Sequence, residues 1–170
     1  SAADYFTVQN CDIDFSGENG IFIQWGSYVT CNNNLINNSN RAGIFCAGGK
    51  NATFTNNLIR NSGIIPGAAI TATQNNGIYI TQNDYCLIQY NEINYSGGNG
   101  IYFTGNNVIV KNNFVNNSCQ ILHDCGGIYT NGNFSDRLIE GNIVLNSFGN
   151  GNGTAKPEFV YAEGIYLDAP

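Results

Sequence analysis

The chain has 170 residues, of which 42% are apolar and 11% are charged, and its formal net charge is −6. This length and apolar content suit one folded domain with a core, which excludes a disordered chain. The six Lys and Arg residues are too few for a nucleic-acid surface, and no apolar run is long enough to span a membrane.

Two sequence patterns alternate along the chain. A pattern of eleven residues, for example "VTCNNNLINNS", occupies 6–16, 29–39, 52–62, 86–96, 108–118 and 137–147. A pattern of five residues, for example "GIYIT", occupies 20–24, 43–47, 77–81, 100–104, 127–131 and 164–168. Successive copies of the shorter pattern begin 23 to 37 residues apart. A period near 23 residues with variable insertions is typical of a solenoid of stacked repeats.

Both patterns predict short β-strands. Their segments alternate and are rich in β-branched and aromatic residues, without a helical stripe. In "GIYIT", Ile78 and Ile80 share one face and Tyr79 and Thr81 share the other. We therefore expect about six turns of three short strands each. Strands of successive turns would pair in parallel about 4.8 Å apart around a dry interior.

The inward-facing positions form four predicted columns. On the five-residue pattern they are Ile21, Ile44, Ile78, Ile101, Ile128 and Ile165, and beside them Ile23, Cys46, Ile80, Phe103, Thr130 and Leu167. On the first strand of the eleven-residue pattern they are Val8, Cys31, Phe54, Ile88, Val110 and Ile139. On its second strand they are Ile13, Ile36, Ile59, Ile93, Val115 and Val144. The longer insertions all follow this second strand, so we expect them to gather at one corner of the coil.

An asparagine recurs between the two strands of the eleven-residue pattern. It stands at Asn34, Asn57, Asn91, Asn113 and Asn142, whereas the first copy has Cys11. With the repeated "NGIY" strand, this column resembles the asparagine ladder of the right-handed parallel β-helix, or pectate-lyase-like, superfamily, over nearly the whole chain. The resemblance implies an all-β coil in which each amide bonds to the next turn and satisfies polar groups at a buried bend. The superfamily hosts many activities, so it leaves the function open.

A single domain is expected over 1–170, without a capping helix and open at both ends. The chain begins with one strand type and ends with "GIYLD", the strand type that precedes it in a turn. Chains placed end to end would therefore continue the coil. Unprotected strand edges pair with other chains, and solenoids normally need polar caps. Either the chain is a repeating unit that stacks head to tail, or it is an excerpt of a longer β-helix.

Sequons and cysteines predict an extracellular, secreted protein. Six N-glycosylation sequons begin at Asn37, Asn51, Asn94, Asn116, Asn133 and Asn152. N-linked glycans are thus expected partners, although an Asn-rich chain also produces sequons by chance. Six cysteines favour an oxidising compartment. The spacing of Cys119 and Cys125 predicts a local disulfide, whereas Cys31, Cys46 and Cys86 fit buried thiols and bridges equally well.

No cofactor or metal is expected. The stretch "DIDFSG" places Asp12, Asp14 and Ser16 at calcium-loop spacing, but Ile23 occupies the position where a bidentate Glu is required. The solenoid repeat explains the same residues as strand and turn. His123 is the only histidine, so with dispersed carboxylates the chain offers no metal cluster. The simplest interpretation of His123 is a solvated loop residue.

An aromatic column is predicted on the outer face of the five-residue strands. Its members are Phe22, Phe45, Tyr79, Tyr102, Tyr129 and Tyr166, beside Gln24, Ala47, Thr81, Thr104, Asn131 and Asp168. Aromatic rings next to amides and hydroxyls suit sugar rings, so the four tyrosines are candidates for carbohydrate stacking. Loops or a neighbouring molecule could equally cover the column, because six exposed aromatic side chains form a large apolar patch.

Catalytic candidates gather near the end of the chain. They are Glu163, Asp168, Asp124 and His123, near Tyr129 and Tyr166. Two carboxylates meeting there could act as acid and base in glycoside cleavage. No active-site motif of the superfamily maps onto these residues one by one.

Two functions from different classes stay open. The first is an extracellular structural glycoprotein whose β-helix stacks head to tail into a filament, which the open ends, sequons and amide-rich surface favour. The alternative is a carbohydrate-active β-helix (polysaccharide lyase, glycoside hydrolase or epimerase) or a fragment of one. The sequence alone does not decide whether the chain is an enzyme.

Overall fold

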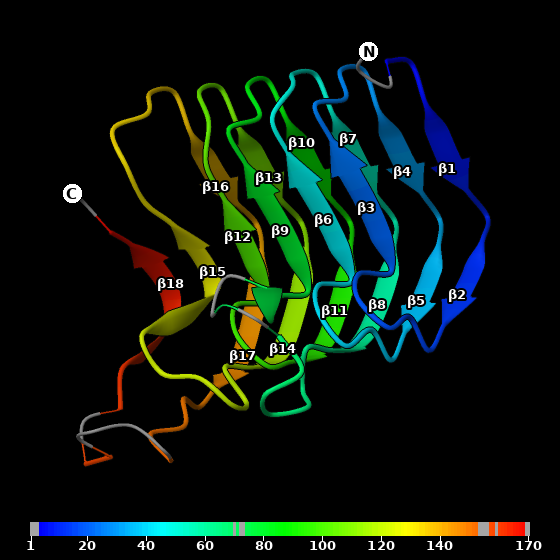
Figure 1. Ribbon diagram of the computed structural model, residues 1–170. Helices are drawn as coiled ribbons and strands as arrows, with labels where there is room; N and C mark the ends of the chain where they lie inside the picture. The colour runs from blue at the N-terminus through cyan, green and yellow to red at the C-terminus, as the bar shows by residue number, and fades with distance from the viewer. Residues whose placement is uncertain (1–3, 70, 72–73, 153–156, 159, 169–170) are drawn as a thin grey trace.

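The computed structural model describes residues 4–69, 71, 74–152, 157–158 and 160–168. This part of the chain contains eighteen β-strands and no α-helix. The chain winds turn by turn into one coil whose two termini lie at opposite ends (Figure 1). The arrangement confirms the predicted all-β coil of about six turns with three short strands per turn.

Three parallel sheets of six strands each form the walls of the coil. Sheet A contains β1 (Thr7–Gln9), β4 (Thr30–Asn32), β7 (Thr53–Thr55), β10 (Leu87–Gln89), β13 (Ile109–Lys111) and β16 (Leu138–Glu140). Sheet B contains β2 (Asp12–Asp14), β5 (Leu35–Asn37), β8 (Leu58–Ser62), β11 (Glu92–Ser96), β14 (Phe114–Ser118) and β17 (Ile143–Ser147). Sheet C contains β3 (Ile21–Gln24), β6 (Ile44–Ala47), β9 (Ile78–Thr81), β12 (Ile101–Phe103), β15 (Cys125–Thr130) and β18 (Ala162–Leu167).

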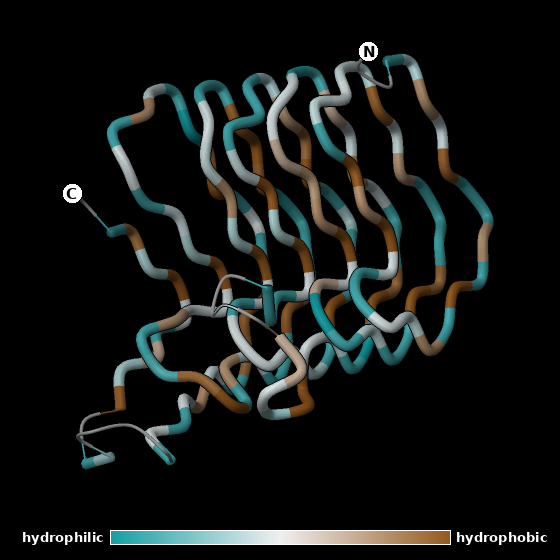
Figure 2. Tube along the Cα trace, in the orientation of Figure 1, coloured by the Kyte–Doolittle hydropathy of each residue, from teal (hydrophilic) through white to brown (hydrophobic). Residues whose placement is uncertain are grey.

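The strand register confirms the four predicted interior columns. In sheet C, Ile101 pairs with Ile78 on one side and with Ile128 on the other. The central members of every column are buried and form one hydrophobic core, so hydrophobic positions recur at corresponding places in successive turns (Figure 2). On the last strand of sheet C, Ile165 and Leu167 keep inward register positions but are 47% and 69% exposed.

The predicted asparagine ladder runs between sheets A and B. Nδ2 of Asn57 donates to Oδ1 of Asn91 at 2.9 Å, and Nδ2 of Asn91 donates to Oδ1 of Asn113 at 3.0 Å. The Oδ1 atom of Asn91 also accepts the backbone N–H of Asn57 at 3.0 Å. The ladder extends to Asn34 and Asn142. Each amide thereby satisfies backbone groups at a buried bend.

Three corners of every turn use left-handed backbone, with φ between 53° and 63°. The corner positions before sheet A are Tyr5, Tyr28, Asn51, Tyr85, Asn107 and Asp136. Those between sheets A and B are Asn10, Asn33, Asn56, Tyr90, Asn112 and Gly141. Those after sheet B are Phe15, Asn38, Asn61, Tyr95, Asn117 and Asn146. Asparagine is common here because it tolerates this backbone region better than most L-residues.

Glycine precedes the core residues of sheet C because neighbouring turns approach closely there. A Cβ atom at residue 100 would lie 2.6 Å from the carbonyl oxygen of Gly127, and one at residue 77 would lie 2.7 Å from that of Gly100. A larger residue would push the turns apart. The glycine repeat in the sequence therefore reflects packing between turns.

The long loops leave the coil between sheets B and C, after β8, β14 and β17. They gather at one corner, below the strands of sheet C in Figure 1, as the insertions predicted. Cys119 and Cys125, which bracket the middle loop, form a disulfide with their Cα atoms 6.1 Å apart. This covalent bond fixes the loop to the first residue of β15. No helix in the described ranges is long and apolar enough to cross a membrane.

Candidate functional site

The predicted aromatic column follows the outer face of sheet C. The stacked rings are those of Phe22, Phe45, Tyr79 and Tyr102, with centroids 4.7–5.2 Å apart and interplanar angles of 8–18°. Tyr129 and Tyr166 continue the column with tilted rings. In the stacked part each ring covers the face of its neighbour, so the column presents ring edges and hydroxyls outward. A sugar would meet the column through these edges and hydroxyls rather than through whole aromatic faces.

Hydrogen bonds hold two phenols of the column in place. The hydroxyl of Tyr102 donates to Oδ1 of Asn131 at 2.9 Å, and that of Tyr129 donates to Oδ2 of Asp168 at 2.7 Å. Burial, and then the neighbouring Tyr79, raise the pKa of Tyr102. Burial, and then the hydrogen bond to Asp168, raise the pKa of Tyr129. Both phenols therefore keep their protons at neutral pH and act as donors.

The three predicted catalytic carboxylates all raise the pKa of Tyr166. The negative charge of Asp168 has the largest effect in raising the pKa of Tyr166, that of Asp124 comes next, and that of Glu163 contributes least. Asp124 and Glu163 are exposed, whereas Asp168 is half-buried. The Nδ1 atom of His123 is buried and makes no hydrogen bond to any described residue. The structure thus links the three carboxylates to the end of the aromatic column, and no hydrogen bond links His123 to them in the described ranges.

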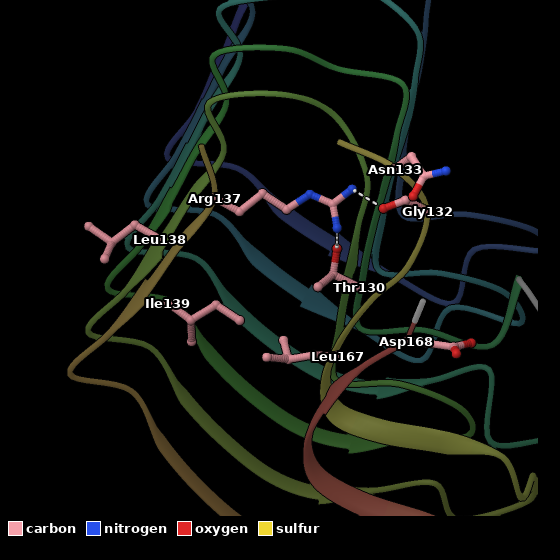
Figure 3. Close-up of a pocket in the computed structure, with 8 residues that line it drawn as sticks. All are labelled: Thr130, Gly132, Asn133, Arg137, Leu138, Ile139, Leu167 and Asp168. Carbon is pink, nitrogen blue, oxygen red and sulfur yellow. Dashed lines mark hydrogen bonds between the residues drawn. The ribbon is translucent and has the colours of Figure 1, made fainter. Parts of the chain in front are cut away.

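A cavity of about 550 Å³ lies next to Asp168. The lining residues are Thr130, Gly132, Asn133, Arg137, Leu138, Ile139, Leu167 and Asp168 (Figure 3). Ile139 and Leu167 hold inward register positions, and their side chains point toward one another across the cavity. The cavity therefore lies in the interior of the coil, at the last described turn.

Arg137 is the only cation among the described residues that line this cavity. Its guanidinium donates to Oγ1 of Thr130 at 2.7 Å and to the carbonyl oxygens of Asn131 and Gly105 at 2.9 and 3.2 Å. It also lies 4.8 Å from the ring centroid of Phe134, and burial lowers its pKa. Because a hydroxyl and backbone carbonyls occupy its donors, Arg137 closes a corner of the coil rather than offering a site for an anion.

The stretch that resembled a calcium loop is part of strand and corner. Asp12 and Asp14 lie on β2. Oδ1 of Asp14 accepts the backbone N–H of Phe15 and Nδ2 of Asn38, both at 2.8 Å. In the described ranges, no group of three or more His, Cys, Asp or Glu side chains is arranged to hold a metal ion.

Three of the six sequons have a structural explanation. Asn37, Asn94 and Asn116 occupy equivalent positions in sheet B. In each case the next residue is a corner position with positive φ, and the third residue is a buried serine. The repeat itself therefore generates the Asn-x-Ser pattern at this corner. Glycans at the six sequons stay a prediction.

Sequence analysis missed the aromatic side chains at the corners of the coil. They belong to Tyr5, Phe15, Tyr28, Tyr85, Tyr90 and Tyr95, and all are exposed. A signal was present in the repeat, because Tyr85, Tyr90 and Tyr95 replace asparagines of the turns before and after them. Comparison of equivalent positions between turns would have found these three residues.

Known proteins share this architecture. The family model for the right handed beta helix region matches residues 1–165. Full-length tailspike protein 2 of the Escherichia coli O157:H7 bacteriophage CAB120 has a TM-score of 0.68 at 16% identity, over 95% of this chain and 21% of that chain. The enzymatically active domain of tailspike protein 2 of bacteriophage CBA120 has a TM-score of 0.64 at 15% identity, over 97% of this chain and 24% of that chain. At such identities the likeness shows the fold alone. No curated protein matches the chain.

Proposed function

Because the chain belongs to the right-handed β-helix family, we propose that the outer face of sheet C binds a neutral polysaccharide between β12 and β18. The proposal rests on the hydrogen-bond network at the end of the aromatic column. There the hydroxyl of Tyr102 donates to Asn131 and that of Tyr129 donates to Asp168. Fixed donors and acceptors beside aromatic edges suit the hydroxyls and the C–H groups of a sugar chain.

Charge favours a neutral ligand over a polyanion. The negative charges of Asp168, Asp124 and Glu163 all act on Tyr166, and the chain as a whole carries a formal charge of −6. The donors of Arg137 are occupied by backbone carbonyls and a hydroxyl. A uronate-rich polysaccharide would be repelled from this face, so lyase or epimerase chemistry on uronates fits it less well.

More specifically, we propose that this site cleaves glycosidic bonds. Asp168 and one of the two exposed carboxylates, Asp124 or Glu163, would supply the acid and the base that this reaction requires. The enzymatically active tailspike domain shares the fold of this chain, and this chain spans less than a quarter of that structure. His123 has no part in the proposed chemistry.

Binding and product analysis test the proposal together. The protein would be incubated with neutral glucans, galactans and mannans and, for comparison, with polygalacturonate. Tyr129→Phe and Asp168→Asn should weaken binding of the neutral polymer, and Asp168→Asn should also stop any release of shorter sugars. Glu140→Gln, on the far side of the coil in sheet A, is the matched control. Unchanged binding by Asp168→Asn would reject the site.

A second candidate function is self-association end to end. Its supporting observation is the exposure of Ile165 and Leu167 on the last strand of sheet C, at positions that are buried in earlier turns. Either a second copy or further turns of a longer chain would cover them. Electron microscopy over a dilution series separates these cases. Fibres with an axial repeat of roughly 29 Å, about six strand spacings, would support stacking, and single particles at every concentration would count against it.

We also propose that the protein is extracellular. The disulfide between Cys119 and Cys125 is its main support, since such bonds persist in oxidising compartments. Intact-mass measurement of the native protein before and after glycosidase treatment tests the proposed N-linked glycans. An unchanged mass that equals the bare polypeptide would reject them.

A further inference from the structure

Three tyrosines occupy successive corners of one turn in an unfavourable backbone conformation. Tyr85, Tyr90 and Tyr95 have φ values of 57°, 56° and 60°. Bulky residues rarely adopt this region, because Cβ approaches the following carbonyl oxygen. The equivalent positions in the turns before and after are all asparagine, namely Asn51, Asn56, Asn61, Asn107, Asn112 and Asn117. The three tyrosines therefore stand where the repeat favours a different residue.

These three side chains are exposed and lack specific partners in the described part of the chain. Tyr85, Tyr90 and Tyr95 are 58%, 56% and 49% exposed. In the described part of the chain, none of their hydroxyls makes a hydrogen bond and none of their rings stacks on another ring. Backbone strain that supports exposed, unpartnered side chains is typical of a functional surface.

We infer that Tyr85, Tyr90 and Tyr95, the corner belt, form a binding surface for a neutral glycan that runs around the coil across sheets A and B. Unlike the stacked rings of sheet C, these rings stack on no other ring of the described residues. Tyrosine offers a large, rigid and amphipathic contact at low cost in conformational entropy, which suits the apolar faces and polar rims of sugars.

The surroundings of the belt suit hydroxyl groups. In the turn after the belt, the side-chain amides of Asn112 and Asn117 make no hydrogen bond to any described residue, so their donors and acceptors are available to a ligand. Between two of the tyrosines, Glu92 is engaged by Nδ2 of Asn94 at 2.9 Å.

The charges beside the belt are of both signs. Lys111 pairs in register with Gln89, and Arg60 pairs in register with Asn94, so these two cations flank the turn that contains Glu92. Neither sign dominates this surface, which favours an uncharged ligand over a polyanion or a basic peptide. The belt lies on sheets A and B, so it does not depend on the aromatic column of sheet C being a site.

The test replaces all three tyrosines by the residue that the neighbouring turns use. Tyr85→Asn, Tyr90→Asn and Tyr95→Asn would be combined, and binding would be measured against a panel of immobilised neutral hexose oligosaccharides in gluco, galacto and manno configuration. We expect the triple variant to lose about tenfold or more in affinity for at least one glycan. Its melting temperature should equal or exceed that of the parent, because Asn tolerates these corners.

Two controls separate the belt from other effects. Tyr28→Asn removes an exposed aromatic corner residue outside the belt and should leave glycan binding unchanged. Tyr129→Phe combined with Asp168→Asn removes the network on sheet C. Loss of binding in this double variant alone would overturn the belt and keep the proposed function, and loss in the triple variant alone would do the reverse. A parent protein that binds no glycan of the panel, or a triple variant that melts below it, would also overturn the inference.

Discussion

The hydroxyl of Tyr129 donates a 2.7 Å hydrogen bond to Oδ2 of Asp168, which lies 39 residues further along the chain. The bond joins β15 to the residue after β18 and places a carboxylate at the end of the aromatic column. Burial and this bond raise the pKa of Tyr129. The pair therefore connects the proposed polysaccharide site to the stability of the last turns at high pH.

The raised pKa of Tyr129 predicts a loss of stability in alkali. The folded protein holds the phenol proton more tightly than the unfolded chain, so this contribution is complete below pH 10, roughly the unfolded value, and is lost as pH rises through the folded pKa. Urea unfolding between neutral pH and pH 11 should show a steeper decline for the parent than for Tyr129→Phe. Parallel declines would mean that Tyr129 does not couple to folding.

Removal of one ladder asparagine should be costly in the middle of the coil. Asn91 is buried, its Nδ2 donates to the carbonyl oxygen of Phe54 at 2.9 Å, and its Oδ1 accepts from Asn57. Asn91→Ala leaves several buried groups unpaired, so we expect the free energy of unfolding to fall by about 2–4 kcal/mol. Asn142→Ala, at the half-exposed end of the ladder, should cost less because water can replace the amide. Equal losses at both positions would contradict this account.

The interior could be predicted from the sequence because its constraints repeat. Every turn must bury the same strand faces and satisfy the same bend, so a column such as Asn57, Asn91 and Asn113 stands out without any knowledge of the fold. A second, shorter ladder escaped notice. In it Nδ2 of Asn99 donates to Oδ1 of Asn76 at 2.9 Å. Asn19 holds the same position in the first turn, but Ala42, Gly126 and Glu163 hold it in the others, so the column in the sequence is incomplete.

The candidate site was less accessible to sequence reasoning because its geometry depends on irregular parts. Spacing placed Tyr129, Tyr166 and Asp168 on one face. The register pairs Tyr129 with Tyr166, and the hydroxyl of Tyr129 donates to Asp168. The positions of His123 and Asp124 depend on the conformation of a single loop, which no repeat constrains. Likewise, the sequence does not show that three backbone carbonyls and a hydroxyl accept hydrogen bonds from the guanidinium of Arg137.

Two opposite substitutions at equivalent corner positions of neighbouring turns should change the free energy of unfolding in opposite directions. Tyr85→Asn relieves left-handed backbone strain and should raise the free energy of unfolding by about 1 kcal/mol. Asn107→Tyr introduces the same strain at the equivalent position of the next turn and should lower it by a similar amount. Denaturant titration of both variants measures the pair. A loss of stability in Tyr85→Asn would show that the tyrosine is held by packing, against the basis of the corner belt.

The cysteines should differ sharply in reactivity. Cys31, Cys46 and Cys86 are free but buried in the core, whereas Cys11 is free and exposed. Burial raises the pKa of Cys31 and of Cys46 to about 12. Since the thiolate is the reactive form, almost none is present in either residue at pH 8.

Iodoacetamide at pH 8 should therefore alkylate one thiol in the native protein, at Cys11. Peptide mass spectrometry identifies the modified residue, and the same treatment in denaturant without reductant, which should modify all four free thiols, is the control. Reductant in denaturant should add Cys119 and Cys125, because these two residues form the disulfide. Rapid alkylation of Cys46 in the native protein would mean that the coil opens around β6, and the dry interior on which the ladder and the columns depend would then not persist in solution.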